Sequence, residues 1–358
     1  MNKLKLIGTT ALASSLVAVS ANAGDMTITG GLEATYSTQS GDANGVAGSH
    51  GKGLGTEKGF TTHGSGELDN GWTFAGYHAI NDGLSTTSAG LSLTMGSMGT
   101  FKMNTVAGVA GAYDGQTPTA WEEIDDGGAT SLSANLVGTK IDGGNNIQWH
   151  SPAYEVAGMS ANLSVEYTPN MGDAAVVNGA VVATQSTGSA WGAGLTVSGG
   201  GLTAGVYGMD GSDDANTGTS DPFEGVWYAN YTMGPVSIGY SQSYFDDGSQ
   251  AATEAATATK AVKTASGLFE TTQMSIAFAV NDQLSISIAD AEDEYDAQSN
   301  VKGGTEIADV TMDMSSIQAA YSMGAMSIKA YRTKTDNVGY RTDGGSITTT
   351  EVALGLSF

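Results

Sequence analysis

The chain has 358 residues and is strongly acidic, because 13 lysines and arginines stand against 37 aspartates and glutamates, for a formal net charge of −24. This charge argues against a nucleic-acid-binding protein, since phosphates require a basic surface, and against a protein that lies on anionic lipid. Cysteine is absent, which excludes disulfide bonds, thiolate chemistry and cysteine-bound zinc. Strong charge is typical of disordered chains, but 14 tyrosines, 8 phenylalanines and 5 tryptophans oppose that interpretation.

Residues 1–23 have the pattern of a secretory signal peptide. Lys3 and Lys5 precede a short apolar run, and an Ala-Asn-Ala sequence that ends at Ala23 is typical of a cleavage site. A membrane anchor is the alternative, but no segment approaches the ~20 apolar residues of a transmembrane helix. We therefore expect cleavage after Ala23 and a single mature domain, residues 24–358, with 11 basic and 37 acidic residues and a net charge of −26.

Sixteen later segments alternate apolar and polar residues with the period of two that β-strands require. In one of them, Met159, Leu163 and Tyr167 alternate with Ser160 and Glu166. The alternation is less clear in the third and tenth segments, so it does not predict which of their side chains share a face. The predicted strands lie at about residues 25–37, 57–68, 72–80, 85–95, 99–106, 145–151, 158–168, 189–198, 202–210, 223–233, 236–245, 267–280, 283–292, 310–322, 326–334 and 347–358.

The connections between these segments alternate between short and long. The short ones, at 69–71, 96–98, 199–201, 234–235, 281–282 and 324–325, hold residues that tight turns favour. The long ones lie at about 38–56, 107–144, 169–188, 211–222, 246–266, 293–309 and 335–346, and the link at 81–84 is the single short member of that set. Alternate connections of an antiparallel barrel lie at opposite rims, as in outer-membrane barrels with short periplasmic turns and long outer loops.

The last strand helps to choose between a membrane barrel and a soluble sandwich or solenoid. Val352, Leu354, Leu356 and Phe358 share one face, and the chain ends on the phenylalanine. A solenoid would show a fixed repeat length, and the sequence has none. With the signal peptide and the loop asymmetry, this ending predicts an all-β fold: a 16-stranded antiparallel transmembrane β-barrel with short periplasmic turns and long outer loops.

One hairpin carries a family resemblance. From Asn145 the chain reads N-N-I-Q-W-H-S-P-A-Y-E-V-A-G, which resembles the sixth-to-seventh strand hairpin of Gram-negative outer-membrane general diffusion porins, with two additional residues before the glycine. The matching residues are Asn145, Ile147, Trp149, Ser151, Pro152, Tyr154 and Gly158. The start at Asp25 and the end at Phe358 resemble the same family, of the alphaproteobacterial type.

This resemblance implies a homotrimeric, water-filled channel in the cell outer membrane, surrounded by outer-membrane lipid. It also implies that Phe358 is recognised by the outer-membrane assembly machinery. The function to expect is passive diffusion of small hydrophilic solutes and ions, with no enzymatic activity and no cofactor. A plugged structural or adhesion barrel is the alternative. The resemblance does not show which solutes pass.

The longest connection, residues 107–144, follows the fifth strand, where porins carry an inward-folded third loop. Loops of this length are usually functional, and a barrel of sixteen strands needs something to narrow its lumen. The loop holds five acidic residues: Asp114, Glu122, Glu123, Asp125 and Asp126. We expect them to line the constriction and to favour cations; the alternative is a loop solvated outside the barrel.

Two lysines are predicted to form the basic part of the pore wall. Lys102 shares a strand face with Thr100 and Asn104. Lys329 likewise shares one with Ser327 and Tyr331. The alternative is solvation at the rim. Lys58, Arg332 and Arg341 have no assigned direction.

No other motif predicts a reaction. The four histidines are scattered, without the spacing of a metal site or a catalytic base. Two acidic segments, Asp210–Asn216 and Asp290–Asp296, have enough oxygen ligands for structural calcium but not the spacing of an EF-hand. Solvated acidic loops are the favoured interpretation of both.

Overall fold

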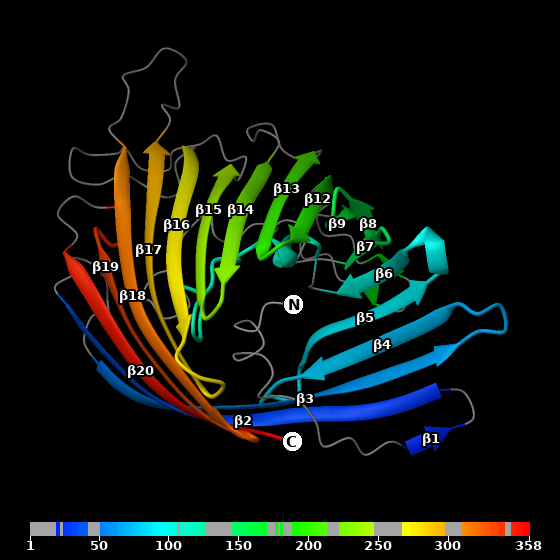
Figure 1. Ribbon diagram of the computed structural model, residues 1–358, viewed down its shortest axis with the longest axis horizontal. Coiled ribbons are helices and arrows are strands. Elements are labelled where there is room, and N and C mark those ends of the chain that lie inside the picture. The colour runs from blue at the N-terminus through cyan, green and yellow to red at the C-terminus, as the bar shows by residue number, and fades with distance from the viewer. Residues whose placement is uncertain are drawn as a thin grey trace, which may run out of the picture.

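The computed structural model describes residues 19–21, 24–41, 51–105, 108–125, 145–169, 176–177, 180–181, 188–212, 222–246, 267–297, 309–340 and 345–358. Its main feature is an 18-stranded antiparallel sheet, in which sixteen strands close into a barrel and the short β1 and β8 pair alongside. Closure is made by β20 pairing with β2, so that no long strand edge is left unpaired. Figure 1 shows the ring of strands, with β20 beside β2.

The barrel strands are β2 (Gly24–Gly41), β3 (Gly51–Glu67), β4 (Thr73–Ile80), β5 (Thr86–Thr94), β6 (Thr100–Thr105), β7 (Asn145–His150), β9 (Met159–Thr168), β12 (Ser189–Gly199), β13 (Leu202–Ser212), β14 (Phe223–Met233), β15 (Val236–Asp246), β16 (Gly267–Ala279), β17 (Leu284–Ala297), β18 (Val310–Met323), β19 (Met326–Asp336) and β20 (Ser346–Ser357). The short elements are β1 (Val19–Ala21), β8 (Tyr154–Val156), β10 (Val176–Val177), β11 (Ala180–Val181), and the 3-10 turns η2 (Gly96–Met98) and η3 (Ala110–Ala112). Among the described residues, no helix has the length and apolar character needed to cross a membrane.

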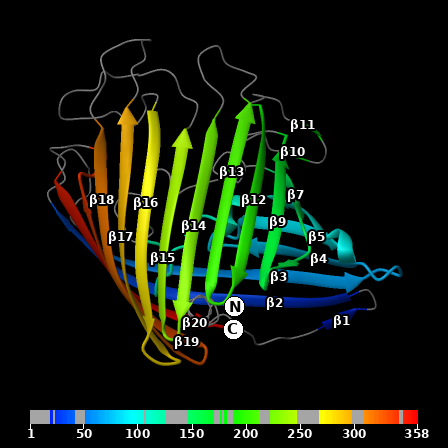
Figure 2. The ribbon, with the colours of Figure 1, turned by 45° about the horizontal axis from the view of Figure 1, so that its top comes forward.

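The strands present apolar side chains outward and polar ones inward. In β17, Ile286 and Ile288 are 44% and 54% exposed, whereas Ser285 and Ser287 between them are 1% and 3% exposed. The exposed face is the outside of the barrel, because the buried side chains contact a loop that runs inside it. Figure 2 shows β12 to β18 as one continuous wall. The sixteen predicted strands and their connectivity are therefore confirmed.

The strands extend further toward the outer loops than predicted. β3 begins at Gly51 instead of residue 57, and β17 continues to Ala297 instead of residue 292. The acidic segment Asp290–Asp296 thus lies within a strand, where Asp293 points inward and is fully buried while its neighbours point outward. Among the described residues, no three His, Asp or Glu side chains come together to hold a metal ion. Structural calcium at this segment stays a prediction, and residues 213–216 of the other acidic segment lie outside the described residues.

The hairpin that carries the family resemblance also differs from a simple turn. Ser151 and Pro152 interrupt the ladder after β7, β8 follows and pairs with β9, and the turn ends with Ala157 and Gly158 at positive φ, 53° and 80°. The two additional residues are thus accommodated as a short extra strand. β1 lies within the predicted signal peptide and pairs with the start of β2; cleavage after Ala23 stays a prediction.

Candidate functional site

The segment 108–125, which belongs to the predicted constriction loop, lies inside the barrel (Figure 1). It contacts inward-facing side chains of the wall from β9 round to β19. Residue 107 and residues 126–144 of the same predicted loop, which include Asp126, lie outside the described residues.

The beginning of the loop is held by Glu166 of β9, which is 1% exposed. One carboxylate oxygen accepts a hydrogen bond from the Val109 N–H at 2.6 Å, and the other accepts from the Ala110 N–H at 3.3 Å and from the Tyr207 hydroxyl at 2.6 Å. Room for this arrangement comes from Gly192, where a Cβ would stand 2.3 Å from the Tyr207 hydroxyl. Hydrogen bonds to an ionised acceptor are among the stronger ones in proteins, so Glu166 fixes the loop where it enters the lumen.

Tyr113 continues this attachment with an aromatic contact. Its ring stacks on Tyr207 at 5.5 Å between centroids and packs against Tyr228 at 6.3 Å. The Thr196 hydroxyl donates a hydrogen bond to the Tyr113 oxygen at 3.3 Å, and Gly194 leaves the space that the ring occupies. Burial disfavours the phenolate and raises the pKa of Tyr113 above its ordinary value. The neutral ring thus belongs to an apolar cluster inside the barrel.

The middle of the loop follows the wall across β14 and β17. The Asn230 amide donates to the Gln116 carbonyl at 2.6 Å, and the Ala120 N–H donates to the Ser287 hydroxyl at 2.9 Å. Both wall residues are inward-facing and buried. The loop is not paired in a strand, so its backbone N–H and carbonyl groups need other hydrogen-bond partners. Side chains of the wall provide them.

The tip is attached to β18 and β19. The backbone N–H of Trp121 donates to the side-chain oxygen of Gln318 at 3.0 Å, and the side-chain amide of Gln318 donates to the backbone carbonyl of Glu122 at 2.9 Å. The Trp121 ring packs on Tyr331 at 5.2 Å, and the Lys329 ammonium lies 4.7 Å from its centroid. The loop is therefore fixed on the wall at both ends of its described part.

Beyond the tip, Ile124 enters a second apolar cluster. It is 1% exposed and packs with Phe269, Tyr295 and Tyr340, whose rings contact one another. The Tyr340 hydroxyl donates to buried Asp293. The lumen of this barrel is consequently not lined by polar groups alone, and its apolar patches lie where the loop covers the wall.

The predicted acidic residues of the loop take different positions. Asp125 is buried, at 5% exposure, and Asp114, Glu122 and Glu123 are half-buried. Glu122 lines a cavity of about 410 Å³ that is also bordered by residues of β2 to β5, β19 and β20. That cavity is also lined by Glu33, Glu57 and Lys329.

Glu33 and Glu57 were missed by the sequence reasoning. They are direct partners across β2 and β3 and point inward. Glu351 of β20 also points inward, opposite Tyr331 in the β19–β20 ladder. Their alternation with outward residues such as Leu32, which is 47% exposed, is the signal that could have identified them.

The two predicted wall lysines both point into the barrel. Lys102 pairs across the ladder with inward-facing Ser92 and Gln148. Lys329 forms an ion pair with Glu33 at 2.6 Å. The other basic residues that the structure describes occupy the outward face, by their pairing with outward residues: Lys52, Lys58, Arg332 and Lys334. Arg341 lies outside the described residues.

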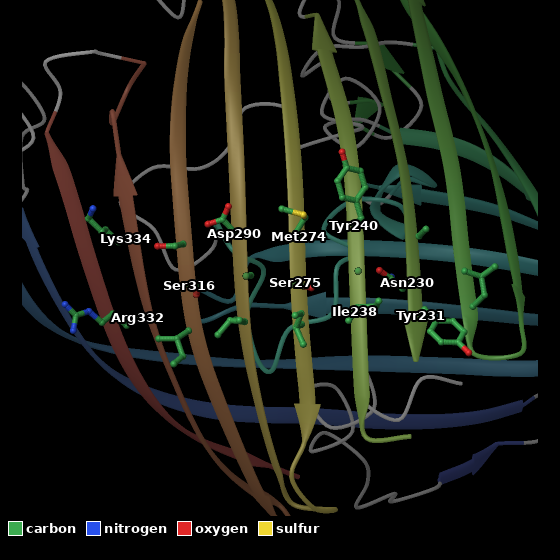
Figure 3. Close-up of a pocket in the computed structure, with 18 residues that line it drawn as sticks. Asn230, Tyr231, Ile238, Tyr240, Met274, Ser275, Asp290, Ser316, Arg332 and Lys334 are labelled. Carbon is green, nitrogen blue, oxygen red and sulfur yellow. The ribbon is translucent and has the colours of Figure 1, made fainter. Parts of the chain in front are cut away.

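One cavity lies on the outer surface of the barrel. It has a volume of about 970 Å³ and lies over β13 to β19 (Figure 3). Its apolar floor is made by outward side chains that are 48–59% exposed: Ile238, Ile276, Ile288 and Ile317. Arg332, Lys334 and Asp290 border this floor.

Comparison with known proteins gives a likeness in structure and none in sequence. No protein-family model and no curated protein matches the chain. Salmonella typhi OmpF, solved with daunomycin, is similar with a TM-score of 0.67 at 11% identity, over 96% of this chain and 100% of that one. An anion-selective porin from Comamonas acidovorans reaches 0.65 at 14% identity, over 94% and 100%, and a Rh. blastica porin mutant reaches 0.55 at 13%, over 93% and 100%. The chain therefore has the fold of the bacterial porins.

Proposed function

We propose that the protein is a passive diffusion channel of the outer membrane for small hydrophilic solutes and ions, and that it prefers cations. The observation that carries this proposal is the one-sided attachment of the loop. It covers the inner wall from β9 to β19, whereas inward-facing Glu57, His63 and Ser65 on β3 are exposed to solvent. Within the described residues, the loop thus covers one side of the inner wall and leaves inward-facing side chains of β3 uncovered, as expected of a diffusion pore that is narrowed but open.

The preference for cations is supported by the direction of the charged side chains. Of six described basic residues, Lys102 and Lys329 point inward, and Lys329 is paired with Glu33. Glu57 and Glu351 also face the lumen, and Glu122 lies at the loop tip. A narrow passage lined by one sign of charge concentrates ions of the opposite sign. One structural neighbour is described as anion-selective, so the fold does not decide the sign of the preference.

Planar-bilayer recording tests the channel and its selectivity. The purified protein should give large, stable conductance steps, and under a tenfold KCl gradient the zero-current potential should have the sign of a K⁺-selective pore. A zero-current potential of the opposite sign would refute the proposed cation preference but not the proposed channel. A reconstituted, folded barrel that gives no steps would favour the plugged structural barrel.

The proposal includes a homotrimer and recognition of the carboxyl terminus during assembly. Phe358 pairs with Gly30 through two backbone hydrogen bonds, of 2.9 and 3.0 Å, and its side chain is 55% exposed on the outside. An exposed terminal aromatic side chain is accessible to an assembly factor. Chemical cross-linking in detergent, followed by mass measurement, distinguishes a trimer from a monomer.

A further inference from the structure

We propose that Lys329 is a positioning residue that clamps the tip of the constriction loop to the wall, instead of a free positive charge of the pore. This inference rests on the proposed channel function and deepens it. It concerns how the narrowest part of the lumen keeps its shape, and which charges remain to act on a permeating ion.

Lys329 joins three parts of the chain that are far apart in sequence. Its ammonium lies 2.6 Å from a carboxylate oxygen of Glu33 on β2 and 4.7 Å from the ring centroid of Trp121 in the loop. The side chains of the ion pair are 16% and 22% exposed, so water screens the pair less than it screens a surface ion pair. A cation over an indole face is the most favourable form of the cation–π contact.

The surroundings hold Trp121 in the position that this contact needs. Tyr331 lies on the same strand face as Lys329, two residues further along, and its ring packs against the indole with centroids 5.2 Å apart. Gln318, which is the ladder partner of Tyr331, accepts a hydrogen bond from the backbone N–H of Trp121. The Trp121 backbone is therefore fixed by an amide, and its indole ring by an aromatic ring and an ammonium, on neighbouring strands.

Glu33 is placed to receive the lysine by the absence of a side chain opposite it. Gly355 is its ladder partner, and a Cβ there would stand 2.7 Å from the Ser327 hydroxyl and 3.4 Å from the Glu33 carboxylate. The carboxylate thus occupies space over the glycine, next to the ammonium of Lys329. Lys329 thus has one partner on the wall, Glu33, and one in the loop, Trp121, as a residue that joins the two is expected to have.

A clamp and a free wall charge have different consequences. A free charge changes the electric field alone, so its removal shifts ion selectivity. Loss of a clamp also releases the loop tip, because the cation–π contact and the ion pair to β2 disappear together. The released population of the tip should rise by about tenfold, in line with the usual strength of such contacts.

The test measures loop mobility and selectivity in the same variants. The chain has no cysteine, so Thr119→Cys, at a half-exposed position beside the tip, provides a single site for a nitroxide spin label. Lys329→Met should increase the mobility of the label in EPR spectra. Trp121→Leu should do the same without changing any charge, and Lys329→Arg should keep the label immobile, since guanidinium retains both contacts.

Lys102→Met is the matched control, because it removes the other inward lysine, whose ladder partners are Ser92 and Gln148 of the wall. It should shift the zero-current potential toward K⁺ and leave the label unchanged. If Lys329→Met shifts the potential in the same way with an unchanged label, Lys329 is a wall charge and the clamp is refuted. If the parent protein gives no conductance, the proposed function fails, whereas the label still decides whether the clamp exists.

Discussion

The attachment of the loop at Glu166 leads to a quantitative prediction. In Glu166→Gln the side chain keeps one oxygen, which can still accept from Ala110 and Tyr207, but an amide NH2 replaces the oxygen that accepts from Val109 at 2.6 Å. Two donors then face each other in a buried site. Hydrogen bonds to charged groups contribute about 1.5–3 kcal/mol, so the substitution should weaken the attachment by about 2–3 kcal/mol.

This loss corresponds to a roughly 30- to 150-fold larger population of the detached state. Hydrogen–deuterium exchange with mass spectrometry should show it as faster exchange of peptides that contain residues 108–116, with the strands unchanged. Glu57→Gln is the control, since it removes an exposed luminal carboxylate on the opposite wall. Unchanged exchange at 108–116 in Glu166→Gln would refute the anchoring role. Faster exchange throughout the barrel would instead assign Glu166 to barrel stability.

Three further predictions follow from the site. Glu57→Gln combined with Glu122→Gln should reduce the K⁺ preference in zero-current potential measurements, with folding yield unchanged; an unaltered potential would place the selectivity elsewhere. The pKa of Tyr113 is raised by burial, so its contribution to loop attachment should be fully present below the ordinary tyrosine pKa of about 10 and be lost only as pH rises through the raised value. Protection of residues 108–116, relative to the intrinsic exchange rate at each pH, that already falls near pH 8 would contradict this. Deletion of Phe358 removes two backbone hydrogen bonds with Gly30 and should lower the yield of folded protein in the outer membrane, measured by fractionation; an unchanged yield would show that the terminal residue is dispensable.

The strands could be predicted from the sequence because the two faces of a membrane barrel have opposite requirements. Outward positions such as Leu354 and Leu356 meet hydrocarbon, and the positions between them do not. The ends of the strands were less predictable. The sequence predicts a loop from residue 293, within an acidic segment, although the strand continues to Ala297. The outward side chains are apolar only over a band of limited height. Beyond this band an outward position tolerates charge, so a charged residue there does not show that the strand has ended.

The candidate site was only partly predictable, because closure of the barrel brings together residues from its two ends. Glu33 lies near the amino terminus and Lys329 near the carboxyl terminus, yet they pair at 2.6 Å once β20 joins β2. Alternation predicts that Lys102 and Lys329 point inward, and their ladder partners Ser92 and Ala353 lie on the same face as each lysine. Alternation could not show that Lys329 contacts Trp121, because this contact depends on which side of the lumen the loop follows.

Inward-facing apolar residues contain the missing information about the path of the loop. An aqueous lumen gives no reason to place Tyr207, Met209, Phe269 or Met312 on the inner face, yet all four are at most 3% exposed. They lie on β13, β16 and β18, where the loop covers the wall, whereas the inward positions of β2 and β3 are polar residues and glycine. Hydrophobic burial requires a covering partner. Once the outward positions are identified, large apolar residues at inward positions should therefore mark the footprint of an internal loop, and the strands that lack them should mark the open side of the pore.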